Sequence, residues 1–252
     1  MYNAFDLTGK VAIVTGVSSG LGIGIAHALA QAGADIVGAA RTSCAETKNK
    51  VEEAGRRFVE VNADLGKMES ISLVTEAALS EFQKIDILVN NAGTVIHNDC
   101  LDFNEDDWDS TMNLNLKGYF FLTQAVGRVF FKQGTGGKII NIASMLSYQG
   151  GLHVPAYAAS KAGVATLTQS FCNEWAGKGI NVNAIAPGYM DTRLNTGLQS
   201  DPIRSRQILE RIPAGRWGTP EDLGGAAVFL ASSASDYVNG FTIAVDGGWL
   251  AR

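Results

Sequence analysis

Short apolar runs alternate with stretches of helical length along almost the whole chain. Most of the apolar runs are rich in β-branched residues and apolar on both faces, which is typical of strands buried under helices on each side. They span residues 10–16, 34–40, 57–64, 85–93, 137–144, 180–188 and 241–248. Helical patterns lie between them, at residues 20–33, 69–83, 105–133, 155–178 and 219–231. This alternation predicts an α/β fold with about seven parallel strands in a doubly wound sheet, connected by right-handed crossovers.

One region departs from this alternation. Residues 189–218, the lid segment below, are polar and have no strand pattern. The segment contains several arginines, namely Arg193, Arg204, Arg206, Arg211 and Arg216. Between two core strands, it is either a mobile lid over a site at the carboxyl edge of the sheet or a solvated helix–turn excursion. No linker or repeat divides the chain, so we expect a single domain over residues 1–252.

Charge and composition narrow the classes of function. The net charge is −5 and no basic block is present, so we expect no nucleic-acid partner. The most apolar long segment, residues 118–131, is interrupted by Gln124, Gly127 and Arg128, which predicts no membrane span. The first residues lack the apolar stretch of a signal peptide, and the three cysteines lie far apart with no metal-ligand spacing. We therefore expect a reduced, cytoplasmic protein without a metal site.

A glycine-rich turn follows the first predicted strand. The stretch TGVSSGLG places small residues just before a predicted helix, at Thr15, Gly16, Ser18, Gly20, Leu21 and Gly22. Glycines allow a sharp turn and a close approach to a pyrophosphate, and a helix N-terminus supplies free N–H groups. Glycine-rich turns between a strand and a helix also occur often with a purely structural role. The position of this one, after the first strand of a βαβ unit, favours a dinucleotide site.

Tyr157 and Lys161 stand four residues apart in a predicted helix and so share one of its faces. Alone, such a pair is most often solvated. Ser144, at the end of the fifth predicted strand, and Asn115, in the long preceding helix, give it a context. Hydride transfer to a carbonyl leaves an alkoxide that needs a proton, and Tyr157 can supply it. The Lys161 ammonium and a cationic oxidised nicotinamide would both lower the pKa of the Tyr157 hydroxyl. Ser144 would hydrogen-bond the substrate oxygen.

With the TGxxxGxG spacing and Asn91-Ala92-Gly93, these residues make the chain resemble the short-chain dehydrogenase/reductase family over nearly its whole length. The resemblance implies a Rossmann-type fold and a catalytic tetrad of Asn115, Ser144, Tyr157 and Lys161. It also implies that Lys161 binds the nicotinamide ribose and that Asn115 supports a water that conducts the proton to solvent. Further cofactor contacts are implied for several residues, namely Asp64 and Leu65 at the adenine, Asn91, Ala92 and Gly93 beside the cofactor, and Pro187, Gly188 and Thr192 at the carboxamide. A strand-ending turn with Thr192 as a helix cap explains the last three equally well.

Arg41 bears on the choice of nicotinamide cofactor. An acidic residue at the end of the second strand would bind a ribose 2′-hydroxyl and repel a 2′-phosphate. Here the strand ends in Ala40 and Arg41, and a guanidinium pairs well with phosphate. Ser18 and Thr42 could add hydroxyl donors. This favours NADP(H); NAD(H) stays possible if Arg41 is solvated or stacks on adenine.

Several long stretches resemble the members of the family that act on keto-deoxy sugar acids from pectin or alginate breakdown, including GGKIINIASMLSYQGG and RIPAGRWGTPEDL. A reductase acting on a substrate such as 4-deoxy-L-erythro-5-hexoseulose uronate would suit NADPH. Gln149 and His153 lie in the loop before Tyr157, which should face the substrate. A substrate carboxylate needs a cation, either a lid arginine such as Arg193 or Arg252 from a neighbouring subunit.

The chain ends in DGGWLAR, and we expect Trp249 and Leu250 to be exposed in an isolated subunit and buried in an interface. The alternative is that Trp249 packs on its own core. The family's habit of forming tetramers favours a homotetramer with this tail at an interface. Competing functions are another short-chain reductase, such as a 3-oxoacyl-carrier-protein reductase or a gluconate or polyol dehydrogenase, and a non-enzymatic nucleotide sensor. An intact tetrad argues against the sensor.

Overall fold

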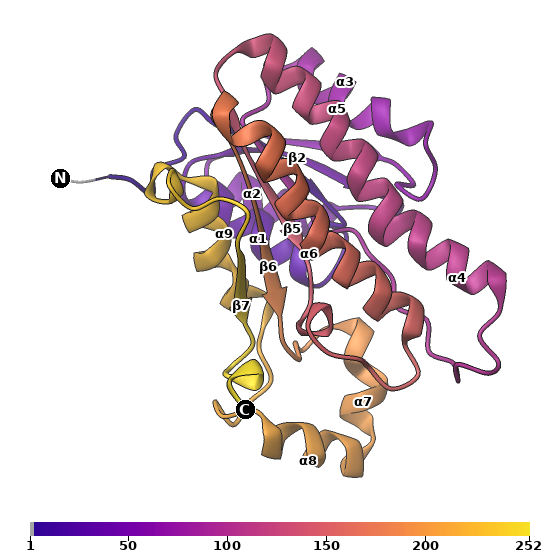
Figure 1. Cartoon of the computed structure of the whole chain (residues 1–252). Helices are drawn as coiled ribbons and strands as arrows, with labels where there is room; N and C mark the ends of the chain where they lie inside the picture. The colour runs from indigo at the N-terminus through magenta and orange to yellow at the C-terminus, as the bar shows by residue number, and fades with distance from the viewer. Residues whose placement is uncertain (1–2) are drawn as a thin grey trace.

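The strands form one parallel sheet, in the spatial order β3-β2-β1-β4-β5-β6-β7. The computed structural model describes residues 3–252. The strand bounds are β1 (Val11–Thr15), β2 (Asp35–Ala40), β3 (Phe58–Asn62), β4 (Ile87–Asn90), β5 (Gly137–Ile142), β6 (Ile180–Pro187) and β7 (Thr242–Val245). All seven expected strands are present, which confirms the predicted doubly wound sheet (Figure 1). The strand order reverses between β1 and β4, which makes the carboxyl edge there the expected place for a ligand.

Helices cover both faces of the sheet. One face carries α1 (Leu21–Gln31), α2 (Ala45–Glu53) and α9 (Gly224–Ala231). The other carries α3 (Ser70–Phe82), α5 (Gly118–Gln133) and α6 (Pro155–Trp175). Helix α2 was not predicted, because its sequence AETKNKVEE is polar and buries only Thr47 and Val51.

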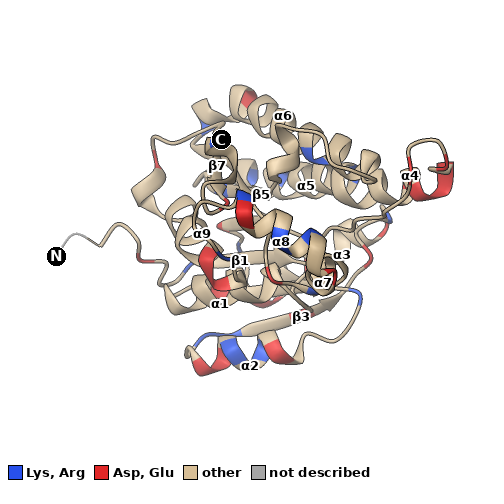
Figure 2. Ribbon diagram, turned by 90° about the horizontal axis from the view of Figure 1, so that it is seen from below, with Lys and Arg blue, Asp and Glu red and all other residues tan. Residues whose placement is uncertain are grey.

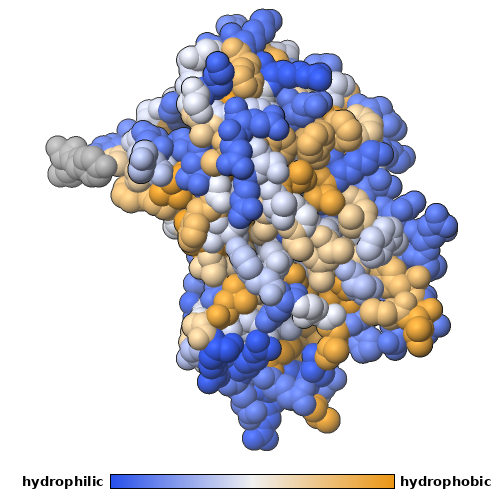
Figure 3. Space-filling view, viewed as in Figure 1, coloured by the Kyte–Doolittle hydropathy of each residue, from blue (hydrophilic) through white to orange (hydrophobic). Residues whose placement is uncertain are grey.

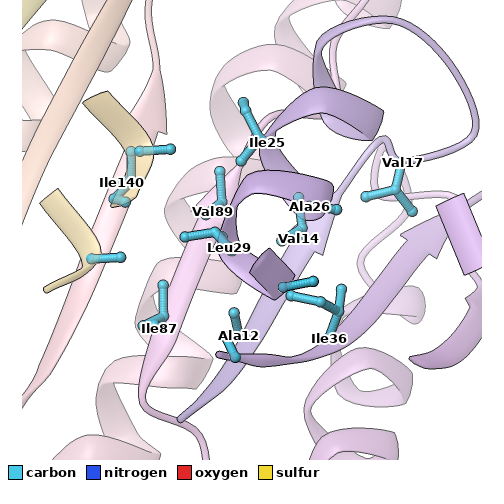
Figure 4. Close-up of a cluster of buried hydrophobic side chains, with 14 of the residues drawn as sticks. Ala12, Val14, Val17, Ile25, Ala26, Leu29, Ile36, Ile87, Val89 and Ile140 are labelled. Carbon is cyan, nitrogen blue, oxygen red and sulfur yellow. The ribbon is translucent and has the colours of Figure 1, made fainter. Parts of the chain in front are cut away.

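Alternate residues of a strand pack on opposite faces, which explains why the strands are apolar on both. On β1, Ala12 and Val14 belong to the cluster under α1, and Val11 and Ile13 belong to the cluster on the other side. Figure 4 shows Ala12 and Val14 beside Leu29 of α1.

The predicted helix over residues 105–133 is not uniform. It consists of α4 (Glu105–Met112), a π-helical turn (Asn113–Lys117) and α5. Asn104 caps α4, since its side chain accepts a hydrogen bond from the Asp107 N–H at 2.9 Å. The π-helical turn contains Asn115, and such turns occur frequently at functional sites.

The lid segment folds into α7 (Thr196–Ser200) and α8 (Pro202–Arg211), below the carboxyl edge in Figure 1. Asp201 caps α8 by accepting from the N–H groups of Ile203 (2.9 Å) and Arg204 (3.1 Å). Asp201 followed by Pro202 is a helix-start signal that can be recognised in the sequence. A helix–turn excursion is therefore present, and the mobility of the segment stays a prediction.

The surface mixes hydrophobic and hydrophilic residues, with hydrophilic ones gathered over the lower end of the molecule (Figure 3). Both charge signs are spread over the molecule, and α8 carries basic residues (Figure 2). Among residues 3–252, no helix combines the length and apolarity needed to cross a bilayer. The same residues contain no cluster of three His, Cys, Asp or Glu side chains suited to a metal ion.

Candidate active site

A cavity of about 930 Å³ lies at the carboxyl edge of the sheet. Its wall includes residues that directly follow four strands: Gly16 after β1, Asn91 after β4, Ala143 after β5 and Gly188 after β6. The topological switch point between β1 and β4 is thus part of this wall. The cavity brings together many of the residues that the sequence singled out, namely Gly16, Gly20, Leu21, Asn91, Ala92, Gly93, Ser144, Gln149, His153, Tyr157, Lys161, Pro187, Gly188, Thr192 and Arg193.

The glycine turn presents unused N–H groups at the start of α1. Gly20 precedes the helix with φ at 60°, a conformation that favours glycine. No side chain caps this helix start, and its first turn has no acidic residue. Gly16 has a φ of 70°, and a Cβ there would lie 2.8 Å from the Ala92 Cα. Gly16 therefore lets the turn touch the segment after β4, and the free helix end suits an anionic group.

Thr15 lies behind the cavity, not in it. Its side chain is completely buried, and Oγ1 accepts from the N–H groups of Asn91 and Ala92, each at 2.9 Å. The Asn91 side chain in turn donates to the Thr15 carbonyl at 2.8 Å. These bonds join the ends of β1 and β4. Thr15 thus holds the Asn91–Ala92–Gly93 segment in place, so any contribution to cofactor binding is indirect.

Lys161 is a buried cation at the floor of the cavity. Its side chain is 3% exposed, and Nζ donates to the Ile142 carbonyl at 2.7 Å. Nζ lies 5.7 Å from the centroid of the Tyr157 ring, as expected for residues one turn apart on α6. Burial lowers the pKa of Lys161 to about 7, because the ammonium loses hydration.

Burial raises the pKa of the Tyr157 hydroxyl, and a hydrogen bond with Ser144 lowers it by less. In the chain without a cofactor, burial therefore disfavours the phenolate more strongly than its neighbours favour it. The lowered pKa, which also depends on the charge of the oxidised nicotinamide, stays a prediction. Ser144 follows β5 in an extended conformation, and its Oγ accepts from the Leu146 N–H at 3.1 Å. Tyr157 and Ser144 are thus close enough to act on one substrate oxygen.

Asn115 has no exposed surface and does not line the cavity. Its Oδ1 accepts from the Thr94 N–H at 2.9 Å, and its Nδ2 donates to the Thr94 carbonyl (2.9 Å) and to Ser160 Oγ (3.2 Å). Both polar atoms of the Asn115 side chain already have protein partners. The water expected at Asn115 would therefore have to hydrogen-bond to its backbone. That role stays a prediction.

The residues expected at the far end of the cofactor lie outside the cavity wall. Arg41 and Thr42 are exposed just after β2, and within residues 3–252 Arg41 forms no ion pair. After β3, Asp64 accepts from the Gly66 N–H at 3.1 Å and Leu65 is buried. Since β1, β2 and β3 are parallel neighbours, these positions extend the same edge. Ser18 is half-buried in the glycine turn and Gly22 is buried in α1.

The loop before α6 and the segment after β6 complete the wall. His153 has a φ of 61°, and its Nδ1 lies 3.6 Å from a carboxylate oxygen of Asp99. Thr192 begins a short helical turn, but its side chain forms no capping hydrogen bond. Among the described residues, the Thr192 side chain therefore does not act as the helix cap that the strand-ending-turn alternative required.

The chain end differs from expectation. Trp249 is only 5% exposed and packs with Met145, Ile208 and Ile212, so the expectation that one subunit would expose it is wrong. Arg252 does not line the cavity; its Nε donates to the Arg211 carbonyl at 3.1 Å. The fold bends the tail back onto α8.

Two aromatic residues of the wall, Tyr189 and Trp249, were not identified from the sequence as site residues. The lid arginines were expected to offer a cation to the substrate carboxylate, and three of them, Arg193, Arg204 and Arg211, line the wall. No periodic signal marks these positions, because they come from separate segments that meet only in the folded chain.

Comparison with known proteins agrees with this geometry. A family model described as enoyl-(acyl carrier protein) reductase matches residues 16–250. The chain is 60% identical to the 2-dehydro-3-deoxy-D-gluconate 5-dehydrogenase of Escherichia coli, over 99% of both sequences. It is 58% identical to the protein of the same name from Dickeya dadantii, again over 99% of both. A crystal structure from Agrobacterium tumefaciens, described as a candidate 2-deoxy-D-gluconate 3-dehydrogenase with bound NADP, has a TM-score of 0.92 and 49% identity over 100% of both chains.

The cavity at the switch point and the Tyr157–Lys161 pair define a dinucleotide-dependent oxidoreductase of α/β fold. The chain belongs to the short-chain dehydrogenase/reductase family.

Proposed function

We propose that this protein is an NADP(H)-dependent oxidoreductase that acts on the carbonyl or secondary alcohol of a keto-deoxy sugar acid. The observation that carries the proposal is full-length identity of 58–60% to two proteins named 2-dehydro-3-deoxy-D-gluconate 5-dehydrogenase. The reaction interconverts the ketone and the alcohol at C5 of such an acid. A related candidate substrate is 4-deoxy-L-erythro-5-hexoseulose uronate.

The residues present fit a nicotinamide dinucleotide. The uncapped start of α1 offers N–H groups to a pyrophosphate, and Gly20 keeps that approach open. Arg41, exposed and without an acidic partner among the described residues, suits a 2′-phosphate. The related Agrobacterium structure was solved with NADP, which supports the same preference here.

When bound, the nicotinamide supplies or accepts the hydride. The chain's own part is to hold the substrate oxygen and move its proton. Ser144 hydrogen-bonds that oxygen, and the Tyr157 hydroxyl donates the proton in reduction or accepts it in oxidation. Lys161, fixed by the Ile142 carbonyl, places a positive charge near the Tyr157 ring and stabilises the phenolate while the proton is away. The low-dielectric surroundings strengthen that attraction.

We place the enzyme in the cytoplasm, as a homotetramer. The cysteines support a reducing compartment, since Cys44, Cys100 and Cys172 are all free. A subunit interface at the chain end would involve Leu250 and its exposed neighbours, since Trp249 is already buried within its own subunit. Size-exclusion chromatography with light scattering tests the assembly.

The proposed activity is tested by following the absorbance of the reduced nicotinamide. NADPH and NADH are each offered with keto-deoxy sugar acids, with 5-keto-gluconate and with an acetoacetyl thioester. We expect turnover with the keto-deoxy acids and NADPH, and loss of turnover in Tyr157→Phe with cofactor affinity retained. Activity confined to the thioester would instead identify an acyl-carrier-protein reductase, the second candidate. A fully active Tyr157→Phe enzyme would refute the proposed proton donor.

A further inference from the structure

The end of α8 brings a cation to the cavity wall. The guanidinium carbon of Arg211 lies 3.9 Å from the centroid of the Trp249 ring. Its Nη2 donates to Gln149 Oε1 at 3.3 Å, and all three residues line the cavity. Tyr189 packs edge-to-face with Trp249, with the two ring centroids 4.8 Å apart. Stacking on an aromatic face holds a guanidinium in a fixed plane, so Arg211 is pre-organised for a planar partner.

The charge of Arg211 is not compensated by an acid. Elsewhere in the lid segment, Arg206 pairs with Glu210 at 2.7 Å and Arg216 pairs with Asp222 at 2.7 Å. Within the described residues, the side chain of Arg211 has only the Gln149 amide as a hydrogen-bond partner. An amide oxygen satisfies a donor but leaves the positive charge in place.

Like Arg193, Arg204 is another cation of the wall that pairs with no acid among the described residues. Its Nη1 donates to Gln207 Oε1 at 3.0 Å, which is again an amide. Arg204 and Arg211 both act to lower the pKa of Tyr189, although burial of that ring raises it overall. Both guanidinium groups therefore lie near Tyr189, and their charges favour an anion at this part of the wall.

Trp249 contributes an independent sign of a missing acceptor. Its ring is 5% exposed, and its Nε1 is buried without a hydrogen-bond partner among residues 3–252. A buried donor without a partner is costly, and each one calls for an explanation. Because this atom is buried as well as unpaired, a bound anionic oxygen becomes its acceptor only if the side chains around it move.

This group lies beside the reacting end of the cavity. Met145, which directly follows Ser144, packs with Trp249, Ile208 and Ile212 in one cluster. Ser144 and Arg211 therefore both adjoin this cluster, and both line the cavity.

We propose that Arg211, stacked on Trp249, binds the carboxylate of the substrate, and that Arg204 reinforces the positive field. The inference rests on the proposed function and assigns its substrate-binding cation. A charged, planar guanidinium pairs with a carboxylate through two parallel hydrogen bonds, which fixes the orientation of the acid as well as its affinity.

Arg252 holds the end of α8 within its own subunit. Its guanidinium donates to the backbone carbonyls of Glu210 (2.5 Å) and Arg211 (3.1 Å), at the last turn of α8. A cation there satisfies free carbonyls and complements the helix dipole. Within its own subunit, Arg252 is a positioning residue for Arg211; its predicted contact with the substrate of a neighbouring subunit stays a prediction.

The test compares Arg211→Gln with Arg206→Gln. Both lie on α8 and both are exposed, but Arg206 is paired with Glu210 and absent from the cavity wall. Each variant is assayed with a keto-deoxy sugar acid and with its methyl ester, which lacks the charge. For Arg211→Gln, we expect the KM for the acid to rise about 10- to 100-fold, with a change of less than about threefold for the ester and in kcat. Arg206→Gln should match the wild type.

The outcomes separate this inference from the proposed function. A wild-type enzyme that turns over no keto-deoxy sugar acid overturns both. An active wild type with an unchanged KM in Arg211→Gln overturns the inference alone, as does an equal loss for acid and ester. Unchanged NADPH affinity in Arg211→Gln verifies that the variant folds, and Arg211→Lys, which keeps the charge, should recover part of the affinity for the acid.

The role of Arg252 is tested by non-additivity. Arg252→Ala should raise the KM for the acid but not for the ester. Added to Arg211→Gln, it should have no further effect, because it acts only through Arg211. A further rise in the double variant would show that Arg252 contacts the substrate itself, and would overturn the positioning role.

Discussion

Replacing Lys161 by Met should abolish catalysis and yet stabilise the fold at neutral and mildly acidic pH. Lys161 is 3% exposed, and burial lowers its pKa to about 7 from the usual 10.5. Each pKa unit corresponds to about 1.4 kcal/mol, so burying the ammonium costs on the order of 5 kcal/mol. The hydrogen bond to the Ile142 carbonyl, which the variant loses, offsets part of this. We expect a net gain of about 2–4 kcal/mol in the free energy of unfolding.

The pH dependence identifies the cause. Below about pH 7 the lysine is protonated in both the folded and the unfolded state, so the cost of burial is fully present. From there to its unfolded pKa the folded state binds fewer protons, and the stability of the wild type rises with pH. Between about pH 6.5 and about pH 9.5, the free energy of unfolding of the wild type should rise by about 3 kcal/mol relative to that of Lys161→Met. The raised pKa values of Tyr157 and Tyr119 keep both tyrosines protonated in the folded state over this range.

Urea unfolding, followed by circular dichroism at several pH values, measures this difference. Lys178→Met is the matched control, because Lys178 is exposed just beyond the same helix. Its stability should follow the pH dependence of the wild type. Parallel curves for the wild type and Lys161→Met would refute the reasoning, since they would mean that Lys161 has a normal pKa in the folded protein.

Three other expectations concern neighbouring parts of the site. Thr15→Val leaves the N–H groups of Asn91 and Ala92 without an acceptor and should destabilise the protein by about 2–4 kcal/mol; Thr15→Ser should not, and equal urea midpoints for the two variants would contradict the assigned role. Arg41→Ala should raise the KM for NADPH about 10- to 100-fold while leaving the KM for NADH within about threefold; an equal loss with both cofactors would count against a 2′-phosphate contact. The kcat/KM for ketone reduction, measured against pH, should fall above the pKa of about 7 for Lys161, because the ammonium favours proton release by Tyr157; a flat profile through this range would disagree.

The predictability of the fold follows from local physics. Strands buried on both faces need continuous apolar runs, and the turn after β1 needs glycines, so both leave signals in a few consecutive residues. Helices α2 and α8 give weaker sequence signals, because each buries few side chains: Thr47 and Val51 in α2, and Ile208 in α8. The start of α8 could have been identified from Asp201 and Pro202.

The sequence by itself determined the seven-stranded sheet, the glycine turn and the Tyr157–Lys161 pair, since these depend on periodicity and short spacings along the chain. The tertiary structure alone decided which side chains face the cavity and which stand behind it. It placed Thr15 and Asn115 in support of other segments and buried Lys161 enough to lower its pKa. It also stacked Arg211 on Trp249. The hydrogen-bond partners of a side chain and its loss of hydration depend on which distant segments of the chain come into contact. Such contacts leave no signal in a short stretch of sequence.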